Sequence, residues 1–171
     1  MFQQKQLLIL GGMVAAVIAG VIVVFFVVWG APDPLPADAG EKLAFAARWL
    51  LVPGLALFAG VGVTASQRFF IPSAIDGERK VEDGAFEINL RYSQNTVEQL
   101  ALAEVAWTGL ALALPAEEIG VIARMAVMFG IGRLAFWIGY HYAPWARAFG
   151  MVLTAYPTFG ALVYLAWLAF Q

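Results

Sequence analysis

The sequence predicts an all-α integral membrane protein with five transmembrane helices and no soluble domain. Two runs, residues 7–29 and 148–170, are each 23 residues long and contain no Asp, Glu, Lys, Arg or His. A helix needs about 20 apolar residues to cross the hydrocarbon, so either run is long enough. Hydrophobic residues make up 62% of the chain, and its mean hydropathy is +0.79. A soluble domain is closer to half apolar, so lipid is the expected solvent.

The first apolar run, residues 7–29, follows Lys5 and ends before Gly30 and Pro32. A cleavable signal peptide is the alternative interpretation, because it also has a basic start and small residues near its end. The apolar middle of a signal peptide has about 7–15 residues, however, and this run is longer. We therefore expect a retained anchor helix and treat residues 1–31 as a first domain.

Four further spans are predicted downstream, at residues 43–68, 85–114, 115–140 and 145–170. Polar segments at 32–42 and 70–87 contain most of the acidic residues and are expected to be loops. The four spans form the predicted second domain, residues 43–171.

The distribution of basic residues predicts the orientation in the membrane. Six of them lie at or near the span ends on the side of the amino terminus: Lys5, Arg68, Arg79, Lys80, Arg91 and Arg147. Three lie near the other side: Lys42, Arg48 and Arg124. Because Lys and Arg are enriched in cytoplasmic segments, we expect a cytoplasmic amino terminus and a carboxyl terminus outside.

Composition excludes several kinds of chemistry. The formal charge of −2, without a large basic patch, argues against nucleic acid as a partner. The chain has no cysteine and one histidine, His141, so thiolate and multi-histidine metal sites are excluded and no metal is expected. His141 is either a general base or an interfacial residue in a Tyr-His-Tyr run, and we expect the interfacial role.

Polar residues share one face of the third span. Arg91, Asn95 and Glu98 are spaced i, i+4 and i+7, which places them within about 60° of one another, and Gln94 borders this face. An ionised group at the centre of a span costs about 2.5–3.5 kcal/mol on insertion scales, so such groups normally face a bundle and find partners. In one interpretation Glu98 pairs with Arg91 or Arg133 and only holds helices together.

The other interpretation is a polar ligand pocket. The fourth span places Arg133, Phe136 and Tyr140 at i, i+3 and i+7, with Arg147 just beyond the span and Arg68 closing the second span. These arginines outnumber the nearby carboxylates, which favours an anionic ligand, because guanidinium binds carboxylates bidentately and stays charged. Elsewhere, we expect Glu104 to pair with Arg124 on the next span.

Two motifs carry a resemblance to a known family. The segment 91–98, RYSQNTVE, resembles the R-x-x-x-N-x-x-E signature of the MAPEG family, the membrane-associated proteins in eicosanoid and glutathione metabolism. The segment 132–140, GRLAFWIGY, followed by Arg147, is similar to that family's fourth-helix pattern. The spacing from Gly-Tyr to this arginine is similar to the leukotriene C synthase branch. The resemblance covers residues 43–171, so the first span is an added helix before the usual four.

The resemblance implies a homotrimer of four-helix bundles that binds glutathione between neighbouring subunits near the cytoplasmic face. The positions expected to bind glutathione are Arg68, Arg91, Gln94, Asn95, Glu98, Arg133 and Tyr140. Arg147 matches the arginine beside the glutathione sulfur and is the expected catalytic residue. A nearby cation lowers the pKa of a thiol and raises the population of the nucleophilic thiolate, so a cysteine-free protein can perform sulfur chemistry.

Three positions depart from the family pattern. Gln94 stands where the prostaglandin E synthase branch has an arginine, Phe136 replaces a tyrosine or histidine, and Phe69 replaces a second arginine. Two functions are therefore carried forward. The first is a glutathione-dependent transferase or peroxidase acting on lipophilic electrophiles, with glutathione as cosubstrate. The alternative is a non-catalytic protein of the same fold that binds lipid or protein. We expect a bacterial-type member in the inner membrane.

Overall fold

The structure, a computed structural model, describes residues 4–26, 32–71 and 84–171, and these residues form helices and short connections without a strand. The helices within these residues are α1 (Gln4–Phe26), α2 (Ala39–Phe70), α4 (Gly84–Ala113), α5 (Gly120–Tyr142) and α6 (Arg147–Ala169). The predicted all-α fold is confirmed. Residues 27–29 of the first predicted span and most of the loop at 70–87 lie outside the described residues.

Three helix boundaries differ from the prediction, each for a local reason. α2 begins at Ala39, inside the predicted linker, because the Asp38 side chain accepts a hydrogen bond from the Glu41 backbone N–H at 2.9 Å and caps the helix. α4 begins at Gly84, so residues 84–87 of the predicted loop belong to the helix. Residues 115–119 form turns before α5, and the backbone N–H of Glu118 donates to the carbonyl of Pro115 at 3.1 Å.

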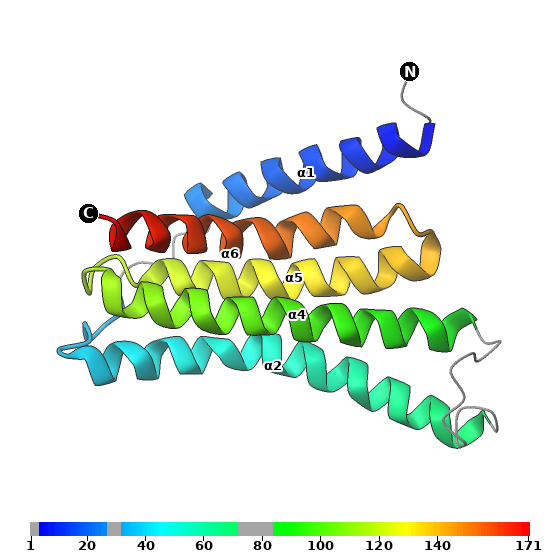
Figure 1. Ribbon diagram of the computed structural model, residues 1–171, viewed down its shortest axis with the longest axis horizontal. Helices are drawn as coiled ribbons and strands as arrows, with labels where there is room; N and C mark the ends of the chain where they lie inside the picture. The colour runs from blue at the N-terminus through cyan, green and yellow to red at the C-terminus, as the bar shows by residue number, and fades with distance from the viewer. Residues whose placement is uncertain (1–3, 27–31, 72–83) are drawn as a thin grey trace.

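The helices run alternately up and down. Figure 1 shows α2, α4, α5 and α6 packed side by side, with α1 lying across the outer face of α6. We name the two ends of this bundle by their connections. The α5–α6 end holds residues 143–146, the end of α2 and the start of α4. The α4–α5 end holds residues 114–119 and the carboxyl-terminal end of α6.

The helices divide into lipid-compatible and polar ones. α1, α2, α5 and α6 are long and apolar enough to cross a membrane, whereas α4 carries charged and amide side chains along its length. Large hydrophobic side chains are exposed on all five helices, as expected where lipid is the solvent. Together these features make the chain an integral multi-pass membrane protein.

Glycines bring α5 and α6 into backbone contact. A Cβ added at Gly150 would collide with the backbone of Phe136 and Gly132, and one added at Gly132 would collide with Thr154. Small residues of this kind let membrane helices approach closely, where van der Waals packing and interhelical hydrogen bonds hold them together. This contact places Arg133 on α5 directly against α6.

Candidate functional site

The exposed face of α4 carries a polar stripe made of Glu87, Arg91, Gln94 and Glu98. Arg91 Nε donates to Glu87 Oε1 at 2.7 Å, and their side chains are 61% and 42% exposed. Gln94 Nε2 donates to Glu98 Oε1 at 3.2 Å. The positions recur at i, i+4, i+7 and i+11, so they run as a line along one side of the helix.

The predicted structural pairing of Glu98 is wrong. Glu98 contacts Gln94 on the exposed side of α4, while Arg133 reaches α4 at Asn95 instead. Within the described ranges, the single ion pair is Arg91–Glu87. Arg91 and Glu98 share a face of α4 but lie seven residues apart, about 10 Å along the helix axis, so each bonds a nearer residue instead.

The predicted pair between Glu104 and Arg124 does not form either. No ion pair joins them in the part of the chain that the structure describes. Glu104 is exposed on α4, whereas Arg124 lines a pocket between α1, α5 and α6. The two side chains leave adjacent helices in different directions, so adjacency alone does not bring them together.

Arg133 is a buried guanidinium that has no carboxylate partner among the residues that the structure describes. Its exposed fraction is 1%, and it lies 4.5 Å from the Phe136 ring centroid. Nη1 donates to Asn95 Oδ1 at 2.8 Å and Nε donates to Thr154 Oγ1 at 3.3 Å. The amide oxygen of Asn95 thus accepts from Arg133, while no bond of Asn95 Nδ2 is found among the described residues.

Tyr140 joins two further guanidinium groups at the α5–α6 end. Arg91 Nη1 donates to Tyr140 Oη at 3.4 Å, and Arg147 Cζ lies 4.5 Å from the centroid of the Tyr140 ring. Arg147 is the first residue of α6, and Ala146 before it provides no side-chain cap for the helix. We call Arg91, Tyr140 and Arg147 the arginine cluster.

The remaining predicted site residue, Arg68, lies in the last turn of α2 at the same end and is exposed. No described hydrogen bond or ion pair links it to the arginine cluster. The structure therefore connects Arg91 with Tyr140 and Arg147, and Arg133 with Asn95. It joins Glu98 to Gln94 and leaves Arg68 apart.

A second polar network at this end was not foreseen. Asn89 Oδ1 accepts from Trp137 Nε1 at 2.7 Å, and Asn89 Nδ2 donates to Gln67 Oε1 at 2.9 Å. His141 Nε2 lies 2.9 Å from the same Asn89 oxygen. An amide oxygen only accepts, so the proton of a neutral His141 sits on Nε2. The i, i+4 spacing of Trp137 and His141 was the available signal, since it puts both on one face of α5.

The fold and the site together define the class of the protein, which is an antiparallel helical bundle in the membrane with guanidinium groups gathered at one end. The sequence profile of the MAPEG family matches residues 43–170. The chain belongs to the MAPEG family. α1 lies outside the matched residues. Comparisons with curated proteins and with solved structures find no match.

Proposed function

We propose that the protein is a glutathione-dependent transferase or peroxidase that acts on lipophilic electrophiles at the α5–α6 end. The observation that carries this proposal is the surplus of guanidinium groups there. Arg91 and Arg147 flank Tyr140. In the described part of the chain, Glu87 is the one carboxylate paired with these arginines, and buried Arg133 has no carboxylate partner. Guanidinium groups that protein anions do not neutralise favour a ligand with carboxylates.

The residues present fit a charged tripeptide. Glutathione carries two carboxylates, an ammonium group and the thiol that supplies the nucleophile. Arg91 and Arg68 suit its carboxylates, Glu98 suits the ammonium group with Gln94 beside it, and Asn95 offers the Nδ2 donor that Arg133 leaves free. Because Arg133 is buried, its proposed contribution is to hold Asn95 in position.

Arg147 is the proposed catalytic residue. It combines a guanidinium charge with the amino-terminal end of α6, where unsatisfied backbone N–H groups add a positive partial charge. Both stabilise an anion near Tyr140, so both shift a thiol placed there toward thiolate. The attack of a thiolate on a lipophilic electrophile or hydroperoxide then needs no cysteine from the chain.

The polar stripe on α4 supports an oligomer. Arg91 and Glu98 are exposed along a helix packed among membrane spans, and charged groups facing lipid cost several kcal/mol. A second copy that covers this face would remove that cost and enclose the ligand. We propose the homotrimer that the family resemblance implies, with the amino terminus cytoplasmic in a bacterial inner membrane. Residues 1–31 serve as an added anchor domain.

The decisive test is activity of the purified full-length protein with Arg147→Ala beside it. Glutathione conjugation and lipid-hydroperoxide reduction are measured together, since the reaction class is open. Loss of one preorganised charge contact typically lowers turnover by roughly 100-fold or more, which is the expected effect. Arg48→Ala, which removes an exposed cation toward the opposite end, serves as a matched control and should keep full activity. Equal activity of Arg147→Ala and wild type would remove the proposed role.

A second function, binding without turnover, is favoured by Phe136. Its buried, uncharged ring packs against Tyr92, Arg133 and Tyr140. The family resemblance implies a tyrosine or histidine at this position. In that case the site binds a lipid or protein partner but lacks a polar group that catalysis requires. Isothermal calorimetry with glutathione and with a lipid distinguishes the two functions. Saturable binding with no product in either assay supports the binding role, and robust turnover removes it.

A further inference from the structure

A second site lies at the α4–α5 end, away from the arginine cluster. A cavity of about 740 Å³ opens between α1, α5 and α6. Its volume falls within the roughly 300–1,000 Å³ that is typical of small-molecule sites. One wall comes from α1, which the family profile does not match, so the cavity is a feature added to the four-helix fold.

The inner part of the cavity is apolar. Val17, Met128 and Leu153 line it, together with Pro157 inside α6. Gly160 also lines it, and a Cβ added there would meet nothing within 4 Å. The missing side chain thus leaves open volume that neighbouring atoms do not fill. This part suits an alkyl chain, since it offers few hydrogen-bonding groups.

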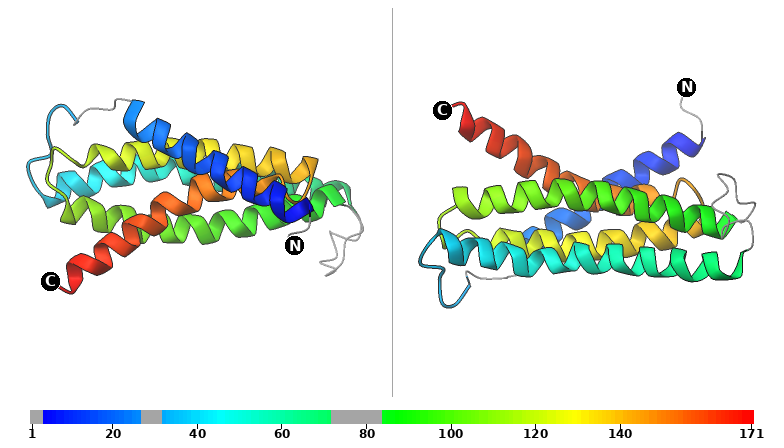
Figure 2. Two further views of the ribbon diagram at one scale, coloured as in Figure 1. Left: turned by 90° about the horizontal axis from the view of Figure 1, so that it is seen from above. Right: turned by 60° about the horizontal axis from the view of Figure 1, so that its bottom comes forward.

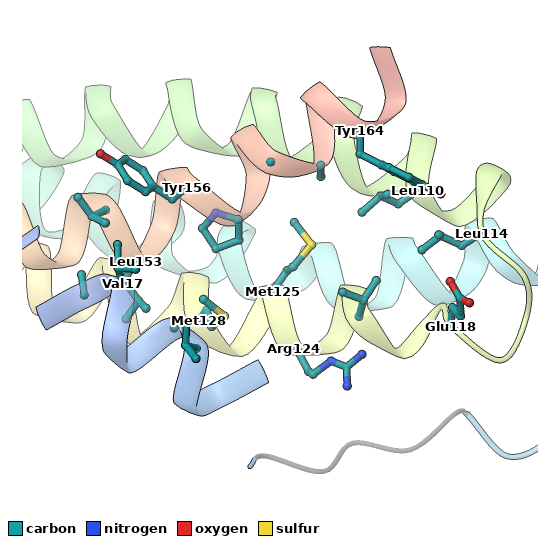
Figure 3. Close-up of a pocket in the computed structure, with 18 of the residues that line it drawn as sticks. Val17, Leu110, Leu114, Glu118, Arg124, Met125, Met128, Leu153, Tyr156 and Tyr164 are labelled. Carbon is teal, nitrogen blue, oxygen red and sulfur yellow. The ribbon is translucent and has the colours of Figure 1, made fainter. Parts of the chain in front are cut away.

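The outer part of the cavity carries charge of both signs. Arg124 lies in the second turn of α5, while Glu117 and Glu118 lie in the connection before it, at the membrane edge. Along the axis of α5, Arg124 is about 6 Å from Met128, given 1.5 Å per residue. Figure 3 shows Glu118 toward one end of the pocket, Val17 and Leu153 toward the other, and Arg124 between them.

Of the residues that the structure describes, Arg124 is the only basic one that lines the cavity. It forms no ion pair with any described residue, and its Nε atom is buried without a hydrogen-bond partner. Lys42 is not a second cation for a ligand here, because its Nζ donates to the Leu114 carbonyl at 2.6 Å. The cavity therefore presents one unpaired cation, two carboxylates at its mouth, and an apolar interior.

From this charge pattern we propose that the cavity is a phospholipid site selective for a zwitterionic head with a primary amine, as in phosphatidylethanolamine. The acyl chain fills the apolar part, the phosphate binds Arg124, and the ammonium group binds Glu117 or Glu118. A purely anionic head would satisfy Arg124 but meet two carboxylates. A quaternary ammonium head would lack the N–H donors that make charge-assisted hydrogen bonds. This site is independent of the glutathione proposal.

The test is native mass spectrometry of the full-length protein in detergent, titrated with phosphatidylethanolamine, phosphatidylglycerol and phosphatidylcholine of identical acyl chains. One added charge-assisted hydrogen-bond pair predicts roughly tenfold tighter retention of phosphatidylethanolamine than of either competitor. This comparison uses the wild-type chain, so it decides the selectivity even if a variant fails to fold. Equal retention of the three lipids would overturn the proposal.

Two variants locate the site, each with a matched control. Arg124→Gln removes the phosphate contact, and Arg48→Gln removes an exposed cation on α2 that does not line the cavity. Gly160→Leu fills the cavity, and Gly62→Leu adds the same side chain at another open position outside it. We expect roughly tenfold weaker phosphatidylethanolamine retention in Arg124→Gln and Gly160→Leu. The controls Arg48→Gln and Gly62→Leu should retain the lipid as the wild type does. Retention unchanged in either cavity variant would overturn the proposal.

The carboxylates are tested separately. Glu117→Gln combined with Glu118→Gln should weaken phosphatidylethanolamine and strengthen phosphatidylglycerol, because it removes both the ammonium partner and the repulsion of an anionic head. A double variant that keeps the wild-type order of lipids would contradict the head-group assignment.

Discussion

The two ends of this bundle use similar residues in opposite ways. At the α5–α6 end, Gly150 lets the backbones of α5 and α6 touch, and polar side chains are linked across helices. At the α4–α5 end, Gly160 faces open volume, and Arg124 has no partner among the described residues. Figure 2 shows the carboxyl-terminal half of α6 diverging from α5, so the helices are in contact at one end and leave room for the cavity at the other. A glycine in a membrane helix therefore closes a contact or opens a cavity, depending on what faces it.

The largest expected effect breaks the close contact. Gly150→Val places a branched side chain against the backbone of Phe136 and Gly132, so we expect a loss of about 3 kcal/mol in the free energy of unfolding. Gly160→Val, ten residues along the same helix, has room and should be nearly neutral. Thermal unfolding in detergent, followed by circular dichroism, measures both. Equal destabilisation by the two variants would mean that the ends do not differ in packing.

The next effect concerns the unforeseen network at the α5–α6 end. Asn89→Ala leaves Trp137 Nε1 and His141 without their shared acceptor, and the loss of such a part-buried hydrogen bond costs about 1 kcal/mol. Gln67→Ala removes only the bond from Asn89 Nδ2 to Gln67 Oε1 and should cost less. Chemical unfolding in mixed micelles measures the free energy of unfolding of both variants. If Gln67→Ala were the more damaging, Asn89 would not be the centre of the network.

A smaller effect separates binding from stability at Arg133. Arg133→Met replaces a buried charge that has no carboxylate with an apolar side chain, so the free energy of unfolding should stay level or rise. Affinity for glutathione should fall roughly tenfold, because Asn95 loses the bond that orients it. Calorimetry and unfolding on the same preparation compare the two quantities. Affinity and stability falling together would indicate a purely structural arginine.

The smallest effect on activity is expected from removing α1. A chain starting at Pro32 keeps the arginine cluster and the α5–α6 contact, so glutathione turnover should be unchanged. It loses the α1 wall of the cavity and should lose selective lipid retention. Activity and native mass spectra of the truncated protein check both. Lost turnover in a protein that still assembles would show that the two ends are coupled.

Much of the architecture followed from local pattern. Apolar runs of spanning length placed the helices, because each run must satisfy its own backbone hydrogen bonds in lipid. Periodicity placed Arg91, Asn95 and Glu98 on one face of α4, and the motif order indicated the family. The connections were less predictable, since the cap at Asp38 and the turns at 115–119 depend on individual hydrogen bonds.

Partner choice was decided only when the helices came together. Glu98, Arg133 and Asn95 are fully visible in the chain, yet which two of them bond depends on the axial shift and rotation of α4 against α5. The pairing of Asn89 with His141 and the cavity around Arg124 arise in the same way. Residue type and spacing determine which face a side chain occupies. Hydrogen bonds act over about 3 Å, a scale that only the packing of one helix on another determines.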